Sequence, residues 1–170
     1  MPGVSRRTVL TGALAGAAAG ALPFPRAFAQ QADRCYGLSY FGDLKYGRTV
    51  HALARLLSTF TNIKLNYVSP DILKMPKEVM DEVNEKGISQ NEFSSLEKVL
   101  PETDVLYVTR VQKERFENAD DYEKVKSAYV IDPAIMQAAK QNMIVMHPLP
   151  RVTEISMGFD DEPRAAYFRQ

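Results

Sequence analysis

Short apolar runs alternate with helical patterns over residues 35–146 of the chain. Runs with the length and composition of strands predict strands over residues 35–41, 63–68, 88–93, 104–109 and 143–146. Apolar residues at helical spacing predict helices between them, over residues 49–60, 75–85, 94–100, 120–126 and 133–141. Strands that alternate with helices are typical of parallel sheets. The pattern therefore predicts an α/β fold, a doubly wound, mainly parallel sheet of about five strands with helices on both faces.

The first 29 residues differ from the rest in composition. They contain three arginines and no acidic residue, and a run of small apolar residues covers positions 9–22. Arg6 and Arg7 before this run, and Ala-Phe-Ala at 27–29, are typical of a twin-arginine export signal with its cleavage site. The run is shorter than the ~20 residues that span a bilayer, so we expect no stable membrane anchor.

We therefore divide the chain into a leader, residues 1–29, and a folded domain, residues 30–170. The whole chain of 170 residues is 45% apolar, which is enough to build a core and excludes a disordered protein. It has 21 basic and 21 acidic side chains, and this balance gives no global positive field for nucleic acid. The single cysteine, Cys35, has no partner for an internal disulfide. We find no catalytic Ser-His-acid pattern and no metal-ligand spacing, and we predict neither a metal nor a cofactor.

Charged and polar residues gather where three of the predicted strands end, at 42–48, 110–115 and 147–151. The carboxyl ends of parallel strands meet at one edge of a sheet, and ligands of such folds bind there. We therefore expect these three segments to form one site. In the first segment, Gly42–Thr49 is close to a phosphate-loop pattern, but Arg48 stands where lysine is required and Asp43 would repel a phosphate. A strand-to-helix turn with solvated charges is the alternative interpretation.

Groups from all three segments suit a substrate with carboxylates and an NH2 group. Arg48 and Arg110 can each hold a carboxylate through two hydrogen bonds, and Gln112 adds one donor and one acceptor. A solvated charged turn is the alternative for residues 113–115. In the third segment two prolines flank Leu149, remove two amide donors and leave carbonyls that can accept bonds from an NH2 group.

Some features of these segments have a structural explanation. The bond before Pro150 is of the X-Pro type, which can adopt the cis form. His147 stands at a strand end and His51 within a helix. We interpret both histidines as structural, because a lone histidine is more often structural than catalytic.

Taken together, these segments closely resemble the aspartate-binding domain of the aspartate carbamoyltransferase family. The resemblance is carried by Gly42–His51, Asp104–Phe116 and His147–Val152, the tail 161–170 fits it, and it covers about residues 36–170. It implies that carboxylates of L-aspartate bind to Arg48, Arg110 and Gln112. It also implies that the carbamoyl NH2 group binds to the backbone of Pro148 and Leu149, and that supporting or domain-closure roles belong to Lys45, Tyr46, Glu114 and Pro150.

The resemblance also implies the reaction. The amine of L-aspartate attacks carbamoyl phosphate and gives N-carbamoyl-L-aspartate and phosphate, a step of de novo pyrimidine biosynthesis in the cytoplasm. Family members need no protein nucleophile or cofactor, and they form homotrimers. Members of the sister family that carbamoylate ornithine carry a cysteine where this chain has Pro148, so the sequence favours aspartate.

The sequence departs from the family in two respects. The Ser-Thr-Arg-Thr phosphate motif of the carbamoyl phosphate domain does not occur in it, and the family's C-terminal helix is missing. We therefore expect a domain truncated at both ends that supplies the aspartate half-site and is inactive alone. The leader conflicts with a cytoplasmic enzyme, and we favour an artefactual leader over real export. The alternative function is a non-catalytic, exported module that binds dicarboxylic amino acids, and an ornithine-type transferase is less favoured.

Overall fold

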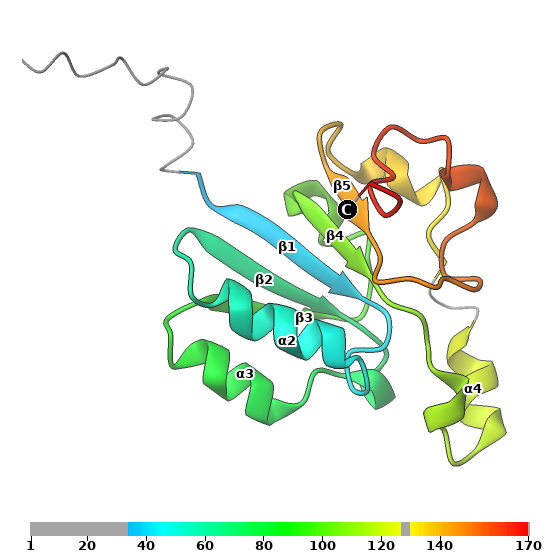
Figure 1. Ribbon diagram of the computed structural model, residues 1–170, viewed down its shortest axis with the longest axis horizontal. Coiled ribbons are helices and arrows are strands. Elements are labelled where there is room, and N and C mark those ends of the chain that lie inside the picture. The colour runs from blue at the N-terminus through cyan, green and yellow to red at the C-terminus, as the bar shows by residue number, and fades with distance from the viewer. Residues whose placement is uncertain (1–33, 127–129, 170) are drawn as a thin grey trace, which may run out of the picture.

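The computed structural model describes residues 34–126 and 130–169, so the predicted leader lies outside the described residues (Figure 1). Five strands form one sheet in the order β3-β2-β1-β4-β5, and every neighbouring pair is parallel. The strands are β1 (Tyr36–Phe41), β2 (Ile63–Val68), β3 (Ser89–Phe93), β4 (Val105–Val108) and β5 (Ile144–Met146). The predicted α/β class and the parallel five-stranded sheet are confirmed, with strand ends within one residue of the predicted ones.

The sheet has an apolar core on each face, because successive side chains of a strand point to opposite faces. On one face three tyrosines from neighbouring strands lie at the same level of the sheet, namely Tyr40, Tyr67 and Tyr107. The next residue of each strand faces the other core, namely Phe41, Val68 and Val108. The interior strand β4, Val105–Val108, has no polar residue apart from Tyr107, as is typical of a strand covered on both faces.

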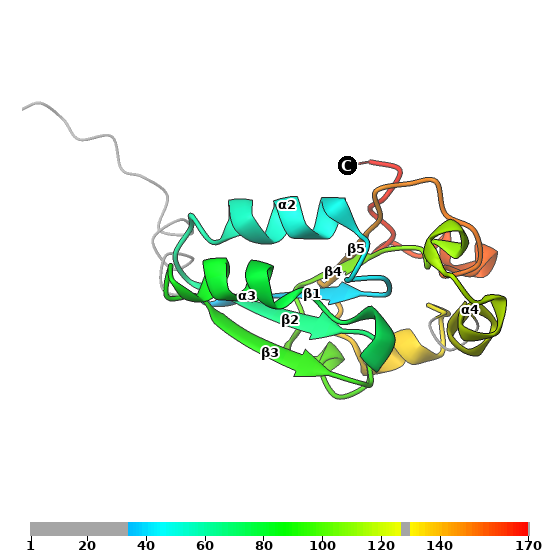
Figure 2. The ribbon, with the colours of Figure 1, turned by 90° about the horizontal axis from the view of Figure 1, so that it is seen from below.

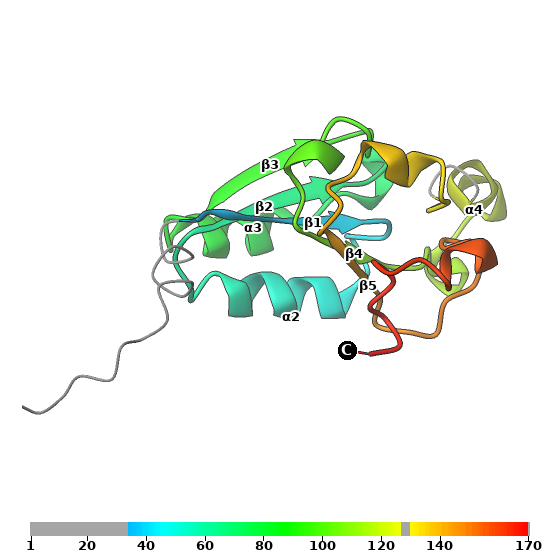
Figure 3. The same cartoon turned by 90° about the horizontal axis from the view of Figure 1, so that it is seen from above.

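The two faces are covered in different ways. Helices α2 (Arg48–Leu57) and α3 (Lys77–Asn84) pack on the tyrosine face (Figures 2 and 3). The other face is covered by irregular segments and three short 3₁₀ helices, η2 (Leu100–Glu102), η4 (Ile135–Ala138) and η5 (Met157–Phe159). Helix α4 (Ala119–Lys126) lies beyond the carboxyl ends of the strands and projects away from the sheet (Figure 1). Helices over 49–60, 75–85 and 120–126 are thus confirmed with shifted ends.

Two predicted helices are wrong, and hydrogen bonding explains both. Residues 94–100 form turns, because Pro101 follows them and has no amide proton with which to continue a helix. Residues 133–141 contain only the short helix η4. There the Met136 carbonyl accepts the amide of Ala139 at 3.2 Å, in a 3₁₀-type turn, and the guanidinium of Arg164 at 3.0 Å. Neither of these hydrogen bonds is the i→i+4 bond of an α-helix.

The order of the strands determines where in the fold a ligand site is expected. Strand β1 lies between β2 and β4, so the chain moves toward one edge of the sheet after β1 and toward the other edge after β4. Ligands of doubly wound sheets bind outside the carboxyl ends of the strands at such a switch point. Gly42, Thr109 and His147 are the first residues after β1, β4 and β5 at this end. Within the described ranges, no helix is long and apolar enough to cross a membrane.

Candidate functional site

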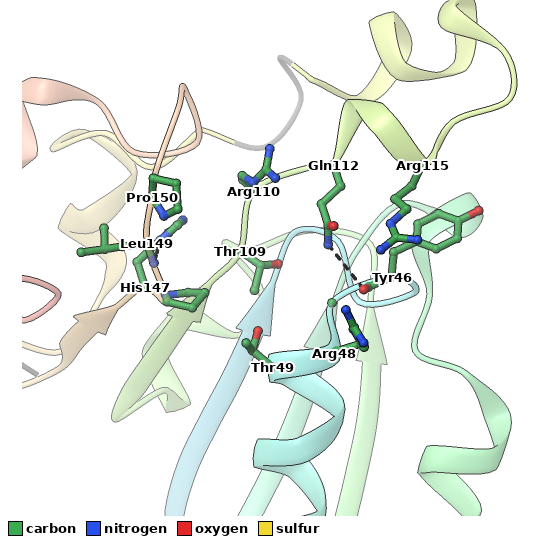
Figure 4. Close-up of a pocket in the computed structure, with 12 residues that line it drawn as sticks. Tyr46, Arg48, Thr49, Thr109, Arg110, Gln112, Arg115, His147, Leu149 and Pro150 are labelled. Atoms are coloured by element: carbon green, nitrogen blue, oxygen red, sulfur yellow. Dashed lines mark hydrogen bonds between the residues drawn. The ribbon is translucent and has the colours of Figure 1, made fainter.

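A cavity of about 280 Å³ opens at the carboxyl ends of β1, β4 and β5 (Figure 4). Each of the three loops that follow these strands contributes to its wall. Its lining residues are Tyr46, Gly47, Arg48, Thr49, Thr109, Arg110, Gln112, Arg115, His147, Pro148, Leu149 and Pro150. The three segments that the sequence predicted to meet do meet in one pocket.

The loop after β1 is organised around a buried carboxylate. Asp43 is fully buried, and one of its oxygens accepts the backbone amide of Tyr46 at 2.9 Å. Its other oxygen accepts the backbone amide of Gln112 at 3.4 Å, so Asp43 connects the first loop to the second. Burial raises the pKa of Asp43 above its ordinary value, although these amides act in the opposite direction. Asp43 therefore fixes the turn that delivers Arg48, and it does not face a ligand.

The loop after β4 carries the second arginine and an amide side chain. Arg110 donates to the carboxylate of Glu114 at 2.6 Å, within a turn whose 3₁₀ helix η3 covers Lys113–Arg115. The backbone of Glu114 and the Arg110 guanidinium lower the pKa of this exposed carboxyl. The Nε2 of Gln112 lies 3.4 Å from the Tyr46 carbonyl, which joins the two loops again (Figure 4).

The loop after β5 has an unusual backbone. Leu149 has a φ of 52°, in the left-handed region, and the Leu149–Pro150 bond is cis. The Leu149 amide donates to His147 Nδ1 at 2.8 Å, and His147 Nε2 lies 2.7 Å from Oε1 of Glu154. His147 is buried and held at both ring nitrogens, as a structural histidine would be, yet it also lines the pocket. In the other histidine, His51, Nε2 lies 2.8 Å from the carbonyl oxygen of Leu44, and this residue does not line the pocket.

The structure brings most of the predicted site residues together. Those that line the pocket are Tyr46, Arg48, Arg110, Gln112, Pro148, Leu149 and Pro150. Lys45 and Glu114 do not line it: the Lys45 ammonium lies 5.1 Å from the centre of the Tyr46 ring, and Glu114 pairs with Arg110.

Sequence reasoning missed several residues of the pocket wall, among them Thr49, Thr109 and Arg115. The sequence interpretation places Arg115 in a solvated turn, although its position five residues after Arg110 in a basic cluster is a signal for the pocket. The pocket thus presents three guanidinium groups, and the guanidinium of Arg110 pairs with the carboxylate of Glu114. Such a pocket suits an anion with more than one acidic group. In the described part of the chain, no group of three acidic, histidine or cysteine side chains could hold a metal ion.

A comparison with protein families matches residues 36–170 to the Asp/Orn binding domain of aspartate/ornithine carbamoyltransferases. The chain belongs to this family. The match begins at the first residue of β1 and includes all three loops of the pocket. The carbamoyltransferase resemblance that the sequence suggested is therefore confirmed.

The relatives of the chain include a multifunctional protein and aspartate carbamoyltransferase catalytic subunits. The chain is 58% identical over 133 residues to the multifunctional protein pyr1-3 of Dictyostelium discoideum, covering 78% of this chain and 6% of that protein. It is 47% identical to the aspartate carbamoyltransferase catalytic subunit of Vibrio vulnificus, covering 78% of this chain and 43% of that subunit. The chain thus spans less than half the length of the catalytic subunits it matches.

Solved structures of carbamoyltransferases have the same fold. The catalytic subunit of M. jannaschii aspartate transcarbamoylase matches with a TM-score of 0.73 and 45% identity, over 80% of this chain and 44% of that one. The Trypanosoma cruzi aspartate transcarbamoylase in complex with carbamoyl phosphate and aspartate matches with a TM-score of 0.72 and 44% identity, over 80% and 46% of the two chains.

Proposed function

We propose that this domain binds L-aspartate and forms the aspartate half of an aspartate carbamoyltransferase site. The observation that carries the proposal is the pocket itself, in which Arg48, Arg110 and Gln112 come from two loops and Pro148 and Leu149 from a third. Two guanidinium groups on separate loops can each take one carboxylate of a dicarboxylic amino acid. The names of the aspartate carbamoyltransferase relatives agree with this ligand.

The proposed chemistry is transfer of a carbamoyl group to the amine of L-aspartate. The amine nitrogen attacks the carbonyl carbon of carbamoyl phosphate, a tetrahedral intermediate forms, and its collapse breaks the C–O bond to phosphate and releases an amine proton. Arg48, Arg110 and Gln112 hold the aspartate carboxylates, so the amine is presented in one orientation. Orientation alone can account for a large share of the rate of such a reaction.

The backbone of Pro148 and Leu149 has the complementary task of accepting hydrogen bonds from the carbamoyl NH2 group. The phosphate group needs cationic partners of its own, and the family's Ser-Thr-Arg-Thr motif does not occur in the sequence. A carbamoyl phosphate domain would supply them, and we expect the chain to be inactive without one. Tyr46 lines the pocket, the Lys45 ammonium lies over the Tyr46 ring, and these two residues are the proposed closure residues.

Ornithine is the less favoured substrate of the two that the family uses. Its side chain ends in an ammonium group, which three nearby guanidinium groups would repel. Pro148 also stands where the ornithine-specific members have cysteine. These two observations favour a second carboxylate in the ligand.

The proposal is tested by an NMR titration of the protein with L-aspartate, succinate and L-ornithine. We expect the two dicarboxylates to shift the amide signals of Arg48, Arg110, Gln112 and their neighbours, and ornithine to leave them unchanged. No response to either dicarboxylate would contradict the proposal. Aspartate binding without turnover, even after a carbamoyl phosphate domain is added, would support the non-catalytic binding module instead.

The cellular location follows from the same proposal. A carbamoyltransferase needs carbamoyl phosphate, so we expect the domain to act in the cytoplasm and the leader not to direct export. The mature N-terminus, mapped by mass spectrometry of protein from cells, tests this expectation. Cleavage after Ala29 would contradict it. The homotrimer implied by the family resemblance stays a prediction.

A further inference from the structure

A buried carboxylate closes the loop that follows β5. The Glu154 side chain is 7% exposed, and Oε1 lies 2.7 Å from Nε2 of His147 at the start of the loop. The same carboxylate accepts the backbone amides of Val152 at 3.2 Å and Thr153 at 3.0 Å. Burial by itself raises the pKa of Glu154, but the bonds from His147 and from the backbone amides of Glu154 and Val152 outweigh it and keep the pKa below its ordinary value. Glu154 is thus an ionised acceptor that joins both ends of the loop.

The hydrogen bonds also define the tautomer of His147. A backbone amide can only donate, so Nδ1 must accept the Leu149 amide, which lies 2.8 Å away, and must carry no proton. The proton of the neutral imidazole is then on Nε2, where it is donated to the Glu154 carboxylate. Nδ1 of His147 is therefore a hydrogen-bond acceptor and Nε2 a hydrogen-bond donor.

This arrangement removes the donors from one wall of the pocket. Pro148 and Pro150 have no amide proton, and the amide of Leu149 is already bonded to His147. The segment from 148 to 150 lines the pocket, and the backbone groups that it has left for a ligand are carbonyl oxygens. An acceptor-only wall favours a ligand that presents N–H groups and disfavours one that presents a carbonyl oxygen or a methyl group.

We propose that His147 and Glu154 are positioning residues: by engaging the Leu149 amide they keep the 148–150 segment, which accepts the carbamoyl NH2 group under the proposed function, free of hydrogen-bond donors. The proposal rests on the proposed function, since the group selected is the NH2 of a carbamoyl group attached to aspartate. Neither residue touches the reacting atoms. Their effect is to take up the one amide proton that would otherwise face the ligand.

The first test compares two ligands of the same shape on the unaltered 170-residue chain. N-carbamoyl-L-aspartate and N-acetyl-L-aspartate differ only by an NH2 group in place of a methyl group. Because one ligand hydrogen bond is lost, we expect N-acetyl-L-aspartate to bind about tenfold more weakly by calorimetry or NMR titration. Equal dissociation constants for the two ligands would overturn the proposal.

Two substitutions of His147 separate its two hydrogen bonds. His147→Asn places a side-chain oxygen near the position of Nδ1, where it can still accept the backbone amide of Leu149. His147→Gln places its side-chain amide near the position of Nε2 and leaves the backbone amide of Leu149 without this acceptor. We expect His147→Gln to reduce the preference for the carbamoyl ligand to about twofold or less, and His147→Asn to retain most of it. The affinity for succinate, which lacks the substituted nitrogen, should change less than twofold in both variants. A variant that weakens all three ligands equally would show a merely structural role and contradict the proposal.

The tautomer is measured on the free protein, so this part of the test needs no ligand and no variant. In a long-range ¹⁵N–¹H spectrum of the imidazole groups, Nδ1 of His147 should have the shift of an unprotonated nitrogen and Nε2 that of a protonated one. The reverse assignment would overturn the proposal even if a substituted protein fails to fold. The two hypotheses fail differently: loss of succinate binding contradicts the proposed function, whereas succinate binding with no carbamoyl preference contradicts this inference alone.

Discussion

At the residue scale, the two arginines of the pocket have different local support. Arg110 is paired with Glu114 at 2.6 Å, whereas Arg48 is the first residue of α2 and its position depends on the turn around Asp43. Pairing with a carboxylate before binding holds a guanidinium in place. Arg110 is thus oriented by a side chain, and Arg48 by the backbone of its helix.

A change of either arginine to lysine should weaken aspartate binding. Lysine keeps the charge but cannot form two parallel hydrogen bonds with one carboxylate. We expect Arg48→Lys and Arg110→Lys each to raise the dissociation constant for L-aspartate about tenfold or more, since a bond to a charged group contributes about 1.5–3 kcal/mol. The matched control is Arg55→Lys, which alters a surface pair with Glu82 outside the pocket. Calorimetric titrations that give the same constant for all four proteins would contradict the assignment.

Glu154 should make the stability of the protein depend on pH. Its pKa is lowered in the folded state from an ordinary value of 4.5, so the folded protein binds this proton less readily than the unfolded chain. The stabilisation is therefore present above pH 4.5 and is lost as the pH falls through the lower folded-state pKa. Urea unfolding at a series of pH values should show a decline below pH 4.5 that is shallower in Glu154→Gln. Identical declines in the two proteins would refute the expectation.

The residues of the site were predictable to different degrees. Arg48, Arg110 and Gln112 could be placed in one pocket because each follows a recognisable strand, and strand ends of a parallel sheet share one edge. Glu154 could not be placed, because it lies in an irregular segment whose geometry follows from two prolines and a left-handed Leu149. Residue spacing does not define such a path, and hydropathy gives no sign of a buried acid.

At the element scale, close contact between the ends of β1 and β4 brings the first two loops together. Gly42 has a φ of +115°, and a Cβ at this position would lie 2.2 Å from the carbonyl oxygen of Thr109. Only glycine satisfies both the backbone angle and the space. The approach of the loop that bears Arg48 to the loop that bears Arg110 therefore depends on this residue.

Gly42→Ala should consequently destabilise the fold and the site together. We expect a loss of about 3 kcal/mol or more in the free energy of unfolding, from a left-handed conformation combined with a backbone clash. Gly87→Ala is the matched control, since Gly87 has a φ of +76° but nothing within 4 Å of the added Cβ. It should cost about 1 kcal/mol. Chemical denaturation of the two variants checks the difference, and equal losses would show that the contact with Thr109 is unimportant.

Elements with strong periodicity were predicted well, and elements defined by single hydrogen bonds were not. The pattern located α2 because Val50 and Ala54 recur on one buried face. It failed at 133–141, where Arg164, distant in the sequence, binds the Met136 carbonyl and the backbone turns tightly. A contact between residues 28 positions apart leaves no trace in local hydropathy.

At the scale of the whole molecule, the proposed function gives this chain one half of the chemistry of an aspartate carbamoyltransferase. The pocket contains groups for carboxylates and for an NH2 group, and the matched catalytic subunits are more than twice as long as the matched region. The strand order, which creates the switch point between β1 and β4, was not contained in the alternating pattern itself. That pattern is compatible with several strand orders, and the order β3-β2-β1-β4-β5 comes from the structure.

Complementation tests whether this half-site works with a second domain. We expect the purified 170-residue chain to show no carbamoyl transfer alone, because carbamoyl phosphate would find no dedicated phosphate partners. Turnover should appear when a separately produced carbamoyl phosphate domain from a relative is added, and it should depend on the concentrations of both proteins. The reaction is measured as N-carbamoyl-L-aspartate formed, with both proteins made in a host that lacks its own enzyme.

Arg110→Lys should reduce the complemented rate at least tenfold, since the aspartate would be held by one hydrogen bond fewer. Turnover by the chain alone would contradict the half-site, and a complemented rate that Arg110→Lys leaves unchanged would place aspartate outside this pocket.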